Sequence, residues 1–542
     1  MLLLLLLQSN LYTVSQPTPS ARASFAADLI LTDFSNFTDV GLLRGWQAAN
    51  AIDSFATYAH KVRASNPDAA AAAAAVLASV FALITSTPDP QNTCLGGWGS
   101  ANDDQQWGLF AWVRAYHVTN DTRFLVEAGK YHDWVTANER QWRSHNASAV
   151  NRCGTMGYHN APAFGPGRQD FKNTITNTQM VLSSMLLHPH AALLGKQPAY
   201  YIDIARDTWA WLEHYGLRNA SSAFWLNGLN MSSCSVNNPN DPGQAWPCTY
   251  NQGVVLAGLG KLALADDDGA VNATLFKIGC DGVAAVARRG GALTTERGIL
   301  HEAEPACDSF WGGPCRRWAI FKGAFFRSLT DFAGSVQEAI VRGGGGGTSA
   351  AMLSQCLGTI QSVAATNAQA VWANARCPVN ASRSSVSPGG QLVRTKAAVL
   401  DNALGASGSG GCSSYSNTDF HGDDVESHTG VKSASACCAL CTGNSKCYAA
   451  AWNGPSYTTC YLKGSKALPV RDVGTTGCHC RGPAPPPLPP PPPPAPRFSY
   501  DWTAERPDFG ASCEKTDTWT NVPSQNVAAA DALNAHLALF DP

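Results

Sequence analysis

Residues 250–259 read Tyr-Asn-Gln-Gly-Val-Val-Leu-Ala-Gly-Leu, and a related pattern returns at residues 320–329 as Ile-Phe-Lys-Gly-Ala-Phe-Phe-Arg-Ser-Leu. Two earlier segments, 177–186 and 105–114, fall on the same frame, so the chain carries an internal repeat of about 70 to 75 residues. Apolar residues recur at three- and four-residue spacing from about Asp28 to Ala375, with no convincing alternating run. The repeat therefore predicts an all-helical domain.

A second predicted helix follows each repeated segment and is itself repeated. Its apolar positions correspond in two copies, which are Phe124, Leu125, Ala128, Trp134 and Val135 in one and Tyr201, Ile202, Ala205, Trp211 and Leu212 in the other. The repeating unit is thus a helical hairpin, and hairpins of this kind stack into an open solenoid or close into a toroid. We interpret the repeated tryptophans Trp134, Trp209 and Trp211 as core packing, because they follow helical spacing.

Polar and aromatic residues gather just before the first helix of each hairpin. They are Asn102, Asp103 and Asp104, then Lys172 and Asn173 through Asn177, then Thr249, Tyr250, Asn251 and Gln252, and finally Phe321 and Lys322. A closed ring would bring these ends together into one site that contains carboxylates, amides, aromatic rings and a lysine, which is typical of sugar binding. An open solenoid would spread them along a ridge.

Asp103 and Asp104 are the acidic pair among these helix ends. A glycosidase needs two carboxyl groups, one to protonate the leaving oxygen and one to attack carbon or activate water. Two other interpretations remain open, because aspartates at a helix start also cap the helix and aspartates in loops bind calcium. The aromatic residues Trp98 and Trp107 on either side of the pair favour the sugar-binding interpretation.

Four motifs in this order resemble glycoside hydrolase family 76, the endo-α-1,6-mannanases and their fungal cell-wall relatives. They are residues 102–107 (Asn-Asp-Asp-Gln-Gln-Trp), 172–177 (Lys-Asn-Thr-Ile-Thr-Asn), 248–253 (Cys-Thr-Tyr-Asn-Gln-Gly) and 321–323 (Phe-Lys-Gly). The resemblance covers roughly Asp28 to Ala375. The chain departs from the family pattern at Gln106 and Gly108, and Pro247-Cys248 separates Trp246 from Thr249.

The resemblance implies an (α/α)6 toroid and glycoside hydrolysis with retention of configuration. Asp103 would be the nucleophile and Asp104 the general acid/base, with no metal and no cofactor. The expected substrate is α-mannan or another mannose-containing polysaccharide. We expect substrate contacts at Trp98, Trp107, Asn173, Asn177, Tyr250, Asn251, Gln252, Phe321 and Lys322.

The expected function is therefore a secreted, retaining endo-α-1,6-mannosidase. Two alternatives stay open, a cell-wall transglycosylase of the same family and a non-catalytic carbohydrate-binding adhesin. Other polar residues near the motifs carry less weight. We interpret His188, His190 and His301 as surface residues, and Glu302 and Glu304 as part of the rim of the site.

Eight cysteines lie between Cys412 and Cys480. A second CxxC pair or an HxxxH pair, as in zinc sites, is missing here, so disulfides in a small extracellular fold are the better interpretation. The segment resembles a PAN/apple module, an α+β fold whose helix is tied to a small sheet. This resemblance implies disulfides joining Cys441 to Cys447 and Cys460 to Cys437 or Cys438. Modules of this family bind proteins or glycans.

Composition changes divide the chain into segments. We expect a signal-like segment at 1–27 with a cleavage point at Ala23, a toroid at 28–377, linkers at 378–411 and 481–497, the cysteine module at 412–480 and an unassigned tail at 498–542. A chain that ends near Leu404 is therefore expected to keep the whole toroid.

Charge and composition narrow the class of protein further. The chain has 542 residues, 14% of them charged, and a formal net charge of -2, so it offers no basic surface for nucleic acid. It also lacks an apolar run long enough to predict a transmembrane segment. Seven Asn-X-Ser/Thr triplets, beginning at Asn36, Asn120, Asn146, Asn219, Asn230, Asn272 and Asn380, agree with a secreted location.

Overall fold

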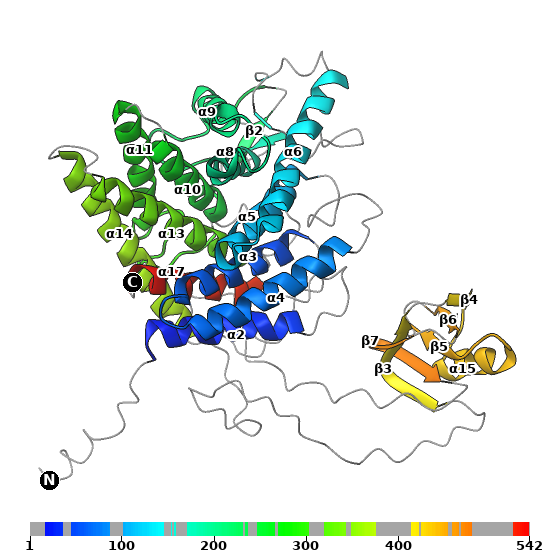
Figure 1. Cartoon of the computed structure of the whole chain (residues 1–542). Helices are drawn as coiled ribbons and strands as arrows, with labels where there is room; N and C mark the ends of the chain where they lie inside the picture. The colour runs from blue at the N-terminus through cyan, green and yellow to red at the C-terminus, as the bar shows by residue number, and fades with distance from the viewer. Residues whose placement is uncertain are drawn as a thin grey trace, which may run out of the picture. The chain divides into compact units, whose positions relative to one another are not determined.

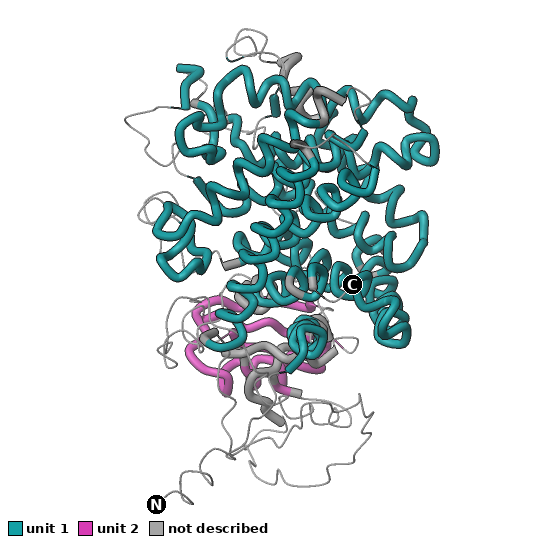
Figure 2. Tube along the Cα trace, turned by 90° about the vertical axis from the view of Figure 1, so that its left-hand side faces the viewer, with its two compact units in different colours: residues 1–381, 495–542 teal, residues 382–494 magenta. Residues whose placement is uncertain are grey.

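The fold is described from a computed structural model of the chain. The described residues are 17–35, 45–86, 101–145, 153, 157–158, 171–230, 233–236, 247–265, 269–302, 319–342, 348–375, 413–421, 424–453, 458–464, 468–479 and 524–540. They form two compact units. One contains residues 1–381 and 495–542, and the other contains residues 382–494, as Figure 2 shows by colour.

Six helices of the first unit form a closed inner ring. In the order in which neighbours pack, they are α3 (Trp46–Val62), α5 (Asn102–Thr119), α8 (Thr174–Leu187), α10 (Thr249–Ala265), α13 (Ala319–Val341) and α17 (Ser524–Phe540). The last of these, α17, packs against α3 and so closes the ring (Figure 1).

Each inner helix pairs with one outer helix. The outer helix α2 (Pro19–Ser35) packs against α17, α4 (Pro67–Ser86) against α3, and α6 (Thr122–His145) against α5. In the same way α9 (Ala199–His214) packs against α8, α11 (Gly269–Ala287) against α10, and α14 (Thr348–Ala370) against α13. The predicted (α/α)6 toroid is therefore confirmed. Shorter elements complete the unit, namely the antiparallel pair β1 (Phe171–Asn173) and β2 (Gly228–Asn230), the 3-10 turn η2 (His188–His190) and the π-helical turn η5 (Val371–Ala375).

The core lies between the two layers of helices. Trp209 and Trp211 are buried in it, as predicted, and Trp134 is half-buried against a smaller cluster that contains Val135. Gly253 explains why the repeated motif carries a glycine, because a Cβ atom at this position would lie 2.5 Å from the Cα atom of Phe325. Helix α10 can approach α13 this closely only without a side chain there.

The tail left unassigned by the sequence supplies the sixth inner helix. Most of the buried side chains of α17 are small or aliphatic, namely Ala529, Ala530, Ala532, Leu533, Ala535, Leu537 and Leu539, and two are polar, Asp531 and Asn534. Helix α17 packs against α2, α3, α13 and α14. The toroid thus continues beyond the cysteine module, whereas the sequence suggested a domain that ends at about residue 377.

Helix α2 corrects the expected N-terminal boundary in the same way. It begins at Pro19, and Ala23, proposed as a cleavage point, is fully buried within it. Cleavage there would remove the first turn of a helix that packs against α17. The buried position of Ala23 argues against a cleavage site.

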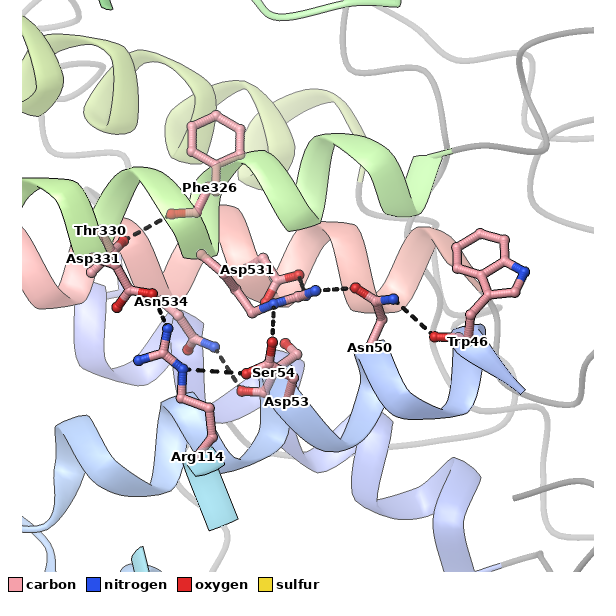
Figure 3. Close-up of polar contacts among 11 residues, drawn as sticks. Trp46, Asn50, Asp53, Ser54, Arg114, Phe326, Thr330, Asp331, Asp531 and Asn534 are labelled. Atoms are coloured by element: carbon pink, nitrogen blue, oxygen red, sulfur yellow. Dashed lines mark hydrogen bonds and ion pairs between the residues drawn. The ribbon is translucent and has the colours of Figure 1, made fainter. Parts of the chain in front are cut away.

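A buried ionic network joins α17 to the rest of the ring (Figure 3). Arg327 of α13 is 3% exposed, and its Nε atom lies 3.0 Å from Asp53 Oδ2 of α3. The same guanidinium group donates to the carboxylate of Asp531 in α17 and to the side-chain oxygen of Asn50 in α3. Nearby, Asn534 Nδ2 donates to the backbone oxygen of Ser54 at 3.3 Å. One arginine therefore connects three inner helices.

A second arginine extends the network to α5. Arg114 Nε lies 3.4 Å from Asp53 Oδ1, and the same side chain forms an ion pair with Asp331 of α13. Burial alone would lower the pKa of Arg114, but the charges of Asp331 and Asp53 outweigh it and raise the pKa. Arg114 thus remains charged inside the ring, and both arginines contact Asp53.

Disulfides reinforce the helical unit at two places. Cys280 of α11 is bonded to Cys356 of α14, which ties two outer helices together, and Cys153 is bonded to Cys234. Among the described cysteines Cys248 is free. No helix among the described residues is both long enough and apolar enough to span a membrane.

The second unit is a small α+β fold. Its five antiparallel strands are β3 (Ser413–His421), β4 (Asp424–His428), β5 (Ala449–Trp452), β6 (Cys460–Lys463) and β7 (Leu468–His479), in the order β3-β7-β5-β6-β4, with helix α15 (Ala434–Gly443) beside them.

Three disulfides tie α15 into this unit. They join Cys437 to Cys460, Cys438 to Cys478 and Cys441 to Cys447. The Cys441–Cys447 prediction is confirmed, and the partner of Cys460 is Cys437. Cys412, Cys480 and both expected linkers lie outside the described residues.

The position of α17 predicts different outcomes for two deletions. A chain that ends at Leu404 lacks α17, so buried faces of α2, α3 and α13 become exposed, and we expect it to lose cooperative unfolding. A chain in which residues 382–494 are replaced by a flexible linker of about 30 Gly/Ser residues keeps α17 and should unfold cooperatively. Circular dichroism during thermal unfolding distinguishes the two. Cooperative unfolding of the shorter chain would contradict the role of α17.

Arg327→Met should strongly destabilise the toroid. The substitution leaves the carboxylates of Asp53 and Asp531 buried without their shared cation, and breaking a buried pair in this way costs about 3–5 kcal/mol. The matched control is Arg342→Met, because Arg342 forms an exposed ion pair with Glu338 at the end of the same helix and such pairs contribute about 0.3–0.5 kcal/mol. Urea unfolding measures both free energies, and equal losses would contradict the network's role.

Candidate active site

The starts of the inner helices lie close together, as the sequence predicted for a closed ring. The ring of Trp46, at the start of α3, stacks on Phe321, at the start of α13, with centroids 5.9 Å apart. Tyr250 in the first turn of α10 lies 4.2 Å from the same ring of Phe321. We call the end of the ring at which α3, α5, α8, α10 and α13 begin the N-terminal face.

Helices α5 and α8 meet at this face through Gln106. Its Nε2 atom donates to the backbone oxygen of Thr176 at 3.0 Å, and its Oε1 atom accepts from the hydroxyl of Ser183 at 3.1 Å. This is one of the positions at which the sequence departs from the family pattern. Its role in this chain is to join two inner helices.

Asp103 and Asp104 occupy the first turn of α5 and are both half-buried. The residue before this helix, Ala101, provides no side-chain cap, and the carboxylate of Asp103 accepts from the N–H of Asp104 at 3.0 Å. Asp103 therefore stabilises the helix start, as the capping interpretation expects. The pair also lies at a helix entry, where neighbouring side chains can face one substrate.

The surroundings of Asp104 change the pKa of its carboxyl group. Burial raises the pKa of Asp104 well above its usual range, and the negative charge of Asp103 raises it further. A carboxyl group that holds its proton at higher pH is suited to act as a general acid. Among the described residues no group of three or more histidine, cysteine or acidic side chains could hold a metal ion.

Tyr250 and Asn251 lie at the same face and contact Asn227. The Oδ1 atom of Asn227 is within 3.5 Å of the Tyr250 hydroxyl and within 3.4 Å of Asn251 Nδ2. Burial raises the pKa of Tyr250, and the nearby Cys248, Asp103 and Glu302 act in the same direction. Tyr250 therefore remains a neutral phenol close to Asp103.

Asn177 and Gln252 hold the backbone rather than facing a substrate. Asn177 accepts from the N–H of Tyr158 at 2.7 Å and donates to its carbonyl oxygen at 3.0 Å. Gln252 does the same for Trp225, at 2.9 and 2.8 Å. The sequence suggested substrate contacts at both positions. In the structure their side-chain amides instead bind the backbone of Tyr158 and of Trp225.

Two other expected contacts, Asn173 and Trp107, also have structural roles. Asn173 caps α8 by accepting from the N–H of Thr176 at 3.1 Å. Trp107 is 6% exposed and packs edge-on against Phe110, so it presents little surface to a sugar. Trp98 lies outside the described residues. His188 and His190 of η2 and His301 are half-buried, so their interpretation as surface residues stays a prediction.

Glu302 and Trp46 contribute more to this face than the sequence suggested. Glu302 is buried and bonded to Thr249, the first residue of α10, so its interpretation as a rim residue is corrected. Glu304 lies outside the described residues. The sequence analysis did not identify Trp46, because it is the first residue of α3, a helix that the detected repeat does not include. A glycine followed by an aromatic residue at the start of a helical run is the sequence feature that could have indicated it.

Comparison with known families assigns the cysteine module. The model of the PAN domain family matches residues 412–477. Residues 412–477 are a PAN domain. Helix α15 of this domain carries Cys437, Cys438 and Cys441, the three cysteines whose disulfides are described above.

Comparison with solved structures finds several similar to the helical unit. The GH76A alpha-1,6-mannanase from Salegentibacter sp. HEL1_6 is 16% identical, with a TM-score of 0.46, covering 65% of this chain and 88% of the mannanase. An inactive variant of it in complex with alpha-1,6-mannotriose is 15% identical, with a TM-score of 0.44, and the match covers 65% of this chain and 88% of the variant. Dfg5 from Chaetomium thermophilum in complex with glucosamine is 14% identical, with a TM-score of 0.47, and the match covers 67% of this chain and 82% of Dfg5. No curated protein matches the chain.

Asp104→Asn should raise the melting temperature at pH 8 and raise it less at pH 5. The folded-state pKa of Asp104 lies above its unfolded value of about 3.9, so the folded protein binds more protons and loses stability as the pH rises through the folded pKa. The uncharged asparagine removes this loss.

Thermal unfolding at both pH values measures the effect. The control is Asp68→Asn, which changes an exposed aspartate in the first turn of α4. If the two variants show the same change of melting temperature with pH, the electrostatic cost assigned to the Asp103–Asp104 pair is wrong.

Proposed function

We propose that the helical unit is a retaining glycoside hydrolase that cleaves α-1,6-linked mannose polymers outside the cell. The observation that carries the proposal is the Asp103–Asp104 pair, which lies in the first turn of α5 among the converging helix starts. The pKa of Asp104 is raised, which suits this carboxyl group to the role of the acid.

In the first step Asp103 would attack the anomeric carbon of the sugar. The bond from this carbon to the glycosidic oxygen breaks, its electron pair stays on that oxygen, and Asp104 donates a proton there. In the second step Asp104, now a carboxylate, takes a proton from water as the water oxygen displaces Asp103 from the same carbon. Two displacements at one carbon restore its configuration, so the product keeps the configuration of the substrate.

Other residues of the N-terminal face support a sugar substrate. Trp46, Phe321 and Tyr250 form a row of aromatic rings, in which Phe321 and Tyr250 are buried and Trp46 is half-buried. Aromatic rings pack against the apolar faces of sugars, and Trp46 is the ring of this row with exposed surface for such a contact. The buried Oδ1 atom of Asn251 has no hydrogen-bond partner among the described residues. The four ordered motifs of the sequence support mannose as that sugar.

The disulfides support the proposed location. Five are present among the described residues, and two of them lie in the helical unit itself. Disulfides persist in oxidising compartments and are rare in the cytosol. In the proposed arrangement the PAN domain binds a glycan or protein near the substrate and raises the local concentration of the enzyme.

Asp103→Asn and Asp104→Asn should each lower the rate of α-1,6-mannan cleavage by about 10²-fold or more, because each removes the nucleophile or the proton donor. Reducing-end release measures the rate, and Asp68→Asn is the control that should keep full activity. Near-normal turnover in either active-site variant would contradict the catalytic assignment and leave helix capping as the role of the pair.

The products of the same reaction show its stereochemistry and whether water or a sugar hydroxyl accepts the mannosyl group. Proton NMR of the first products should show the α-anomer, whereas initial β-anomer would indicate an inverting enzyme. Longer mannose chains in place of free reducing ends would show that a sugar hydroxyl replaces water, as in a transglycosylase. Binding of mannan without any turnover would favour the non-catalytic adhesin.

A further inference from the structure

Glu302 is a buried carboxylate that the mechanism above does not use. Its side chain is 7% exposed. The backbone just before it is fixed, because the N–H of Leu300 donates to Asn367 Oδ1 of α14 at 2.8 Å and the N–H of His301 donates to the backbone oxygen of Leu293 at 2.9 Å. The position of the carboxylate is therefore set by the fold.

Both oxygens of this carboxylate bond to Thr249, the first residue of α10. Oε2 accepts from the backbone N–H at 3.1 Å, and Oε1 accepts from the hydroxyl. The first N–H groups of a helix have no partner within the helix, and its start favours a negative charge. A residue 53 positions away in the chain thus caps α10 immediately before Tyr250, whose ring packs on Phe321.

The charge of Glu302 affects the pKa of neighbouring side chains at the start of α10, and the charge of Lys322 affects the pKa of Glu302. Burial raises the pKa of Glu302, whereas the two Thr249 donors and the positive charge of Lys322 oppose that rise. Lys322 lies at the start of α13 and is 6% exposed. The charge of Glu302 in turn helps to raise the pKa of Cys248 and of Tyr250, and Asp103 also acts on Tyr250.

We propose that Glu302 is a positioning residue of the active site, which fixes the first turn of α10 and with it the ring of Tyr250. This inference rests on the proposed function. The negative charge of Glu302 also helps to keep the phenol of Tyr250 neutral, and Asp103 acts on the same phenol. Glu302 therefore supports the site without contacting substrate.

Three substitutions test this role. Glu302→Gln keeps the size of the side chain and removes its charge. Thr249→Val removes the hydroxyl donor and keeps the charge of Glu302. The matched control is Glu296→Gln, which removes an equal charge from an exposed position in the same loop.

Rates on α-1,6-mannotetraose are the first measurement. Glu302→Gln should lower kcat by about 10- to 100-fold, because small displacements of catalytic groups cost that much, and should change KM less. The alkaline limb of its pH profile should move to lower pH, since removing a negative charge from the site makes loss of a proton from its acidic groups easier. Thr249→Val should lower kcat without moving that limb, and Glu296→Gln should match the unmodified protein.

Alkylation of Cys248 is a second measurement that needs no enzymatic activity. The Cys248 thiol is half-buried, and the charge of Glu302 contributes to its raised pKa. Glu302→Gln should therefore speed its reaction with iodoacetamide at pH 8 several-fold relative to Glu296→Gln. Mass spectrometry of the peptide that contains Cys248 measures this rate.

The outcomes separate the two proposals. Absence of mannan cleavage by the unmodified protein would overturn the proposed function, while faster Cys248 alkylation in Glu302→Gln would still support the placement of its charge. An active unmodified protein together with kcat and pH profile unchanged in Glu302→Gln would overturn the positioning role alone. If Glu302→Gln fails to fold, an unchanged kcat in Thr249→Val would overturn it as well.

Discussion

The contact between Arg327 and its three partners is the constraint on which the toroid depends. One buried guanidinium group joins Asp53 and Asn50 of α3 to Asp531 of α17, and so connects the first and last inner helices through α13. A charge buried at this depth is costly unless it is paired, so the ring is stable only when all three helices are in place. The other inner helices follow one another in sequence, and Arg114 extends the same network to α5.

This closure also explains the organisation of the chain. The PAN domain lies within the range 382–494, between η5 and α17, so it is inserted into the sequence of the toroid rather than appended to its end. The expected boundary at residue 377 marks the end of the detectable repeat, and the toroid is completed only by residues on the other side of the insertion.

Local pattern in the sequence predicted much of the fold, and long-range contacts account for what it missed. The repeat predicted the hairpins and the convergence of their ends, because helical periodicity depends on nearby residues. Helix α17 has few polar or aromatic features beyond Asp531 and Asn534, and its alanine-rich face shows no similarity to the repeat. Its place in the ring is visible only through partners that lie hundreds of residues earlier.

The same distinction holds at the candidate site. Asp103 and Asp104 could be identified because they are adjacent in the sequence and precede a helix. Asn177 and Gln252 resembled sugar ligands because amides bind hydroxyls, but the same amides serve equally well to bind a backbone N–H and carbonyl together. Glu302 was underestimated because spacing alone does not reveal a bond to a threonine 53 residues earlier.

The contact of α17 with α2 and α3 also affects how the chain folds while it is being synthesised. The first two helices of the toroid emerge almost five hundred residues before their partner, so their apolar faces stay uncovered through most of translation. The PAN domain, with its own disulfides, is synthesised before the ring can close. Aggregation during synthesis is therefore the main hazard for the nascent protein, and chaperones that shield its N-terminal helices should determine its yield.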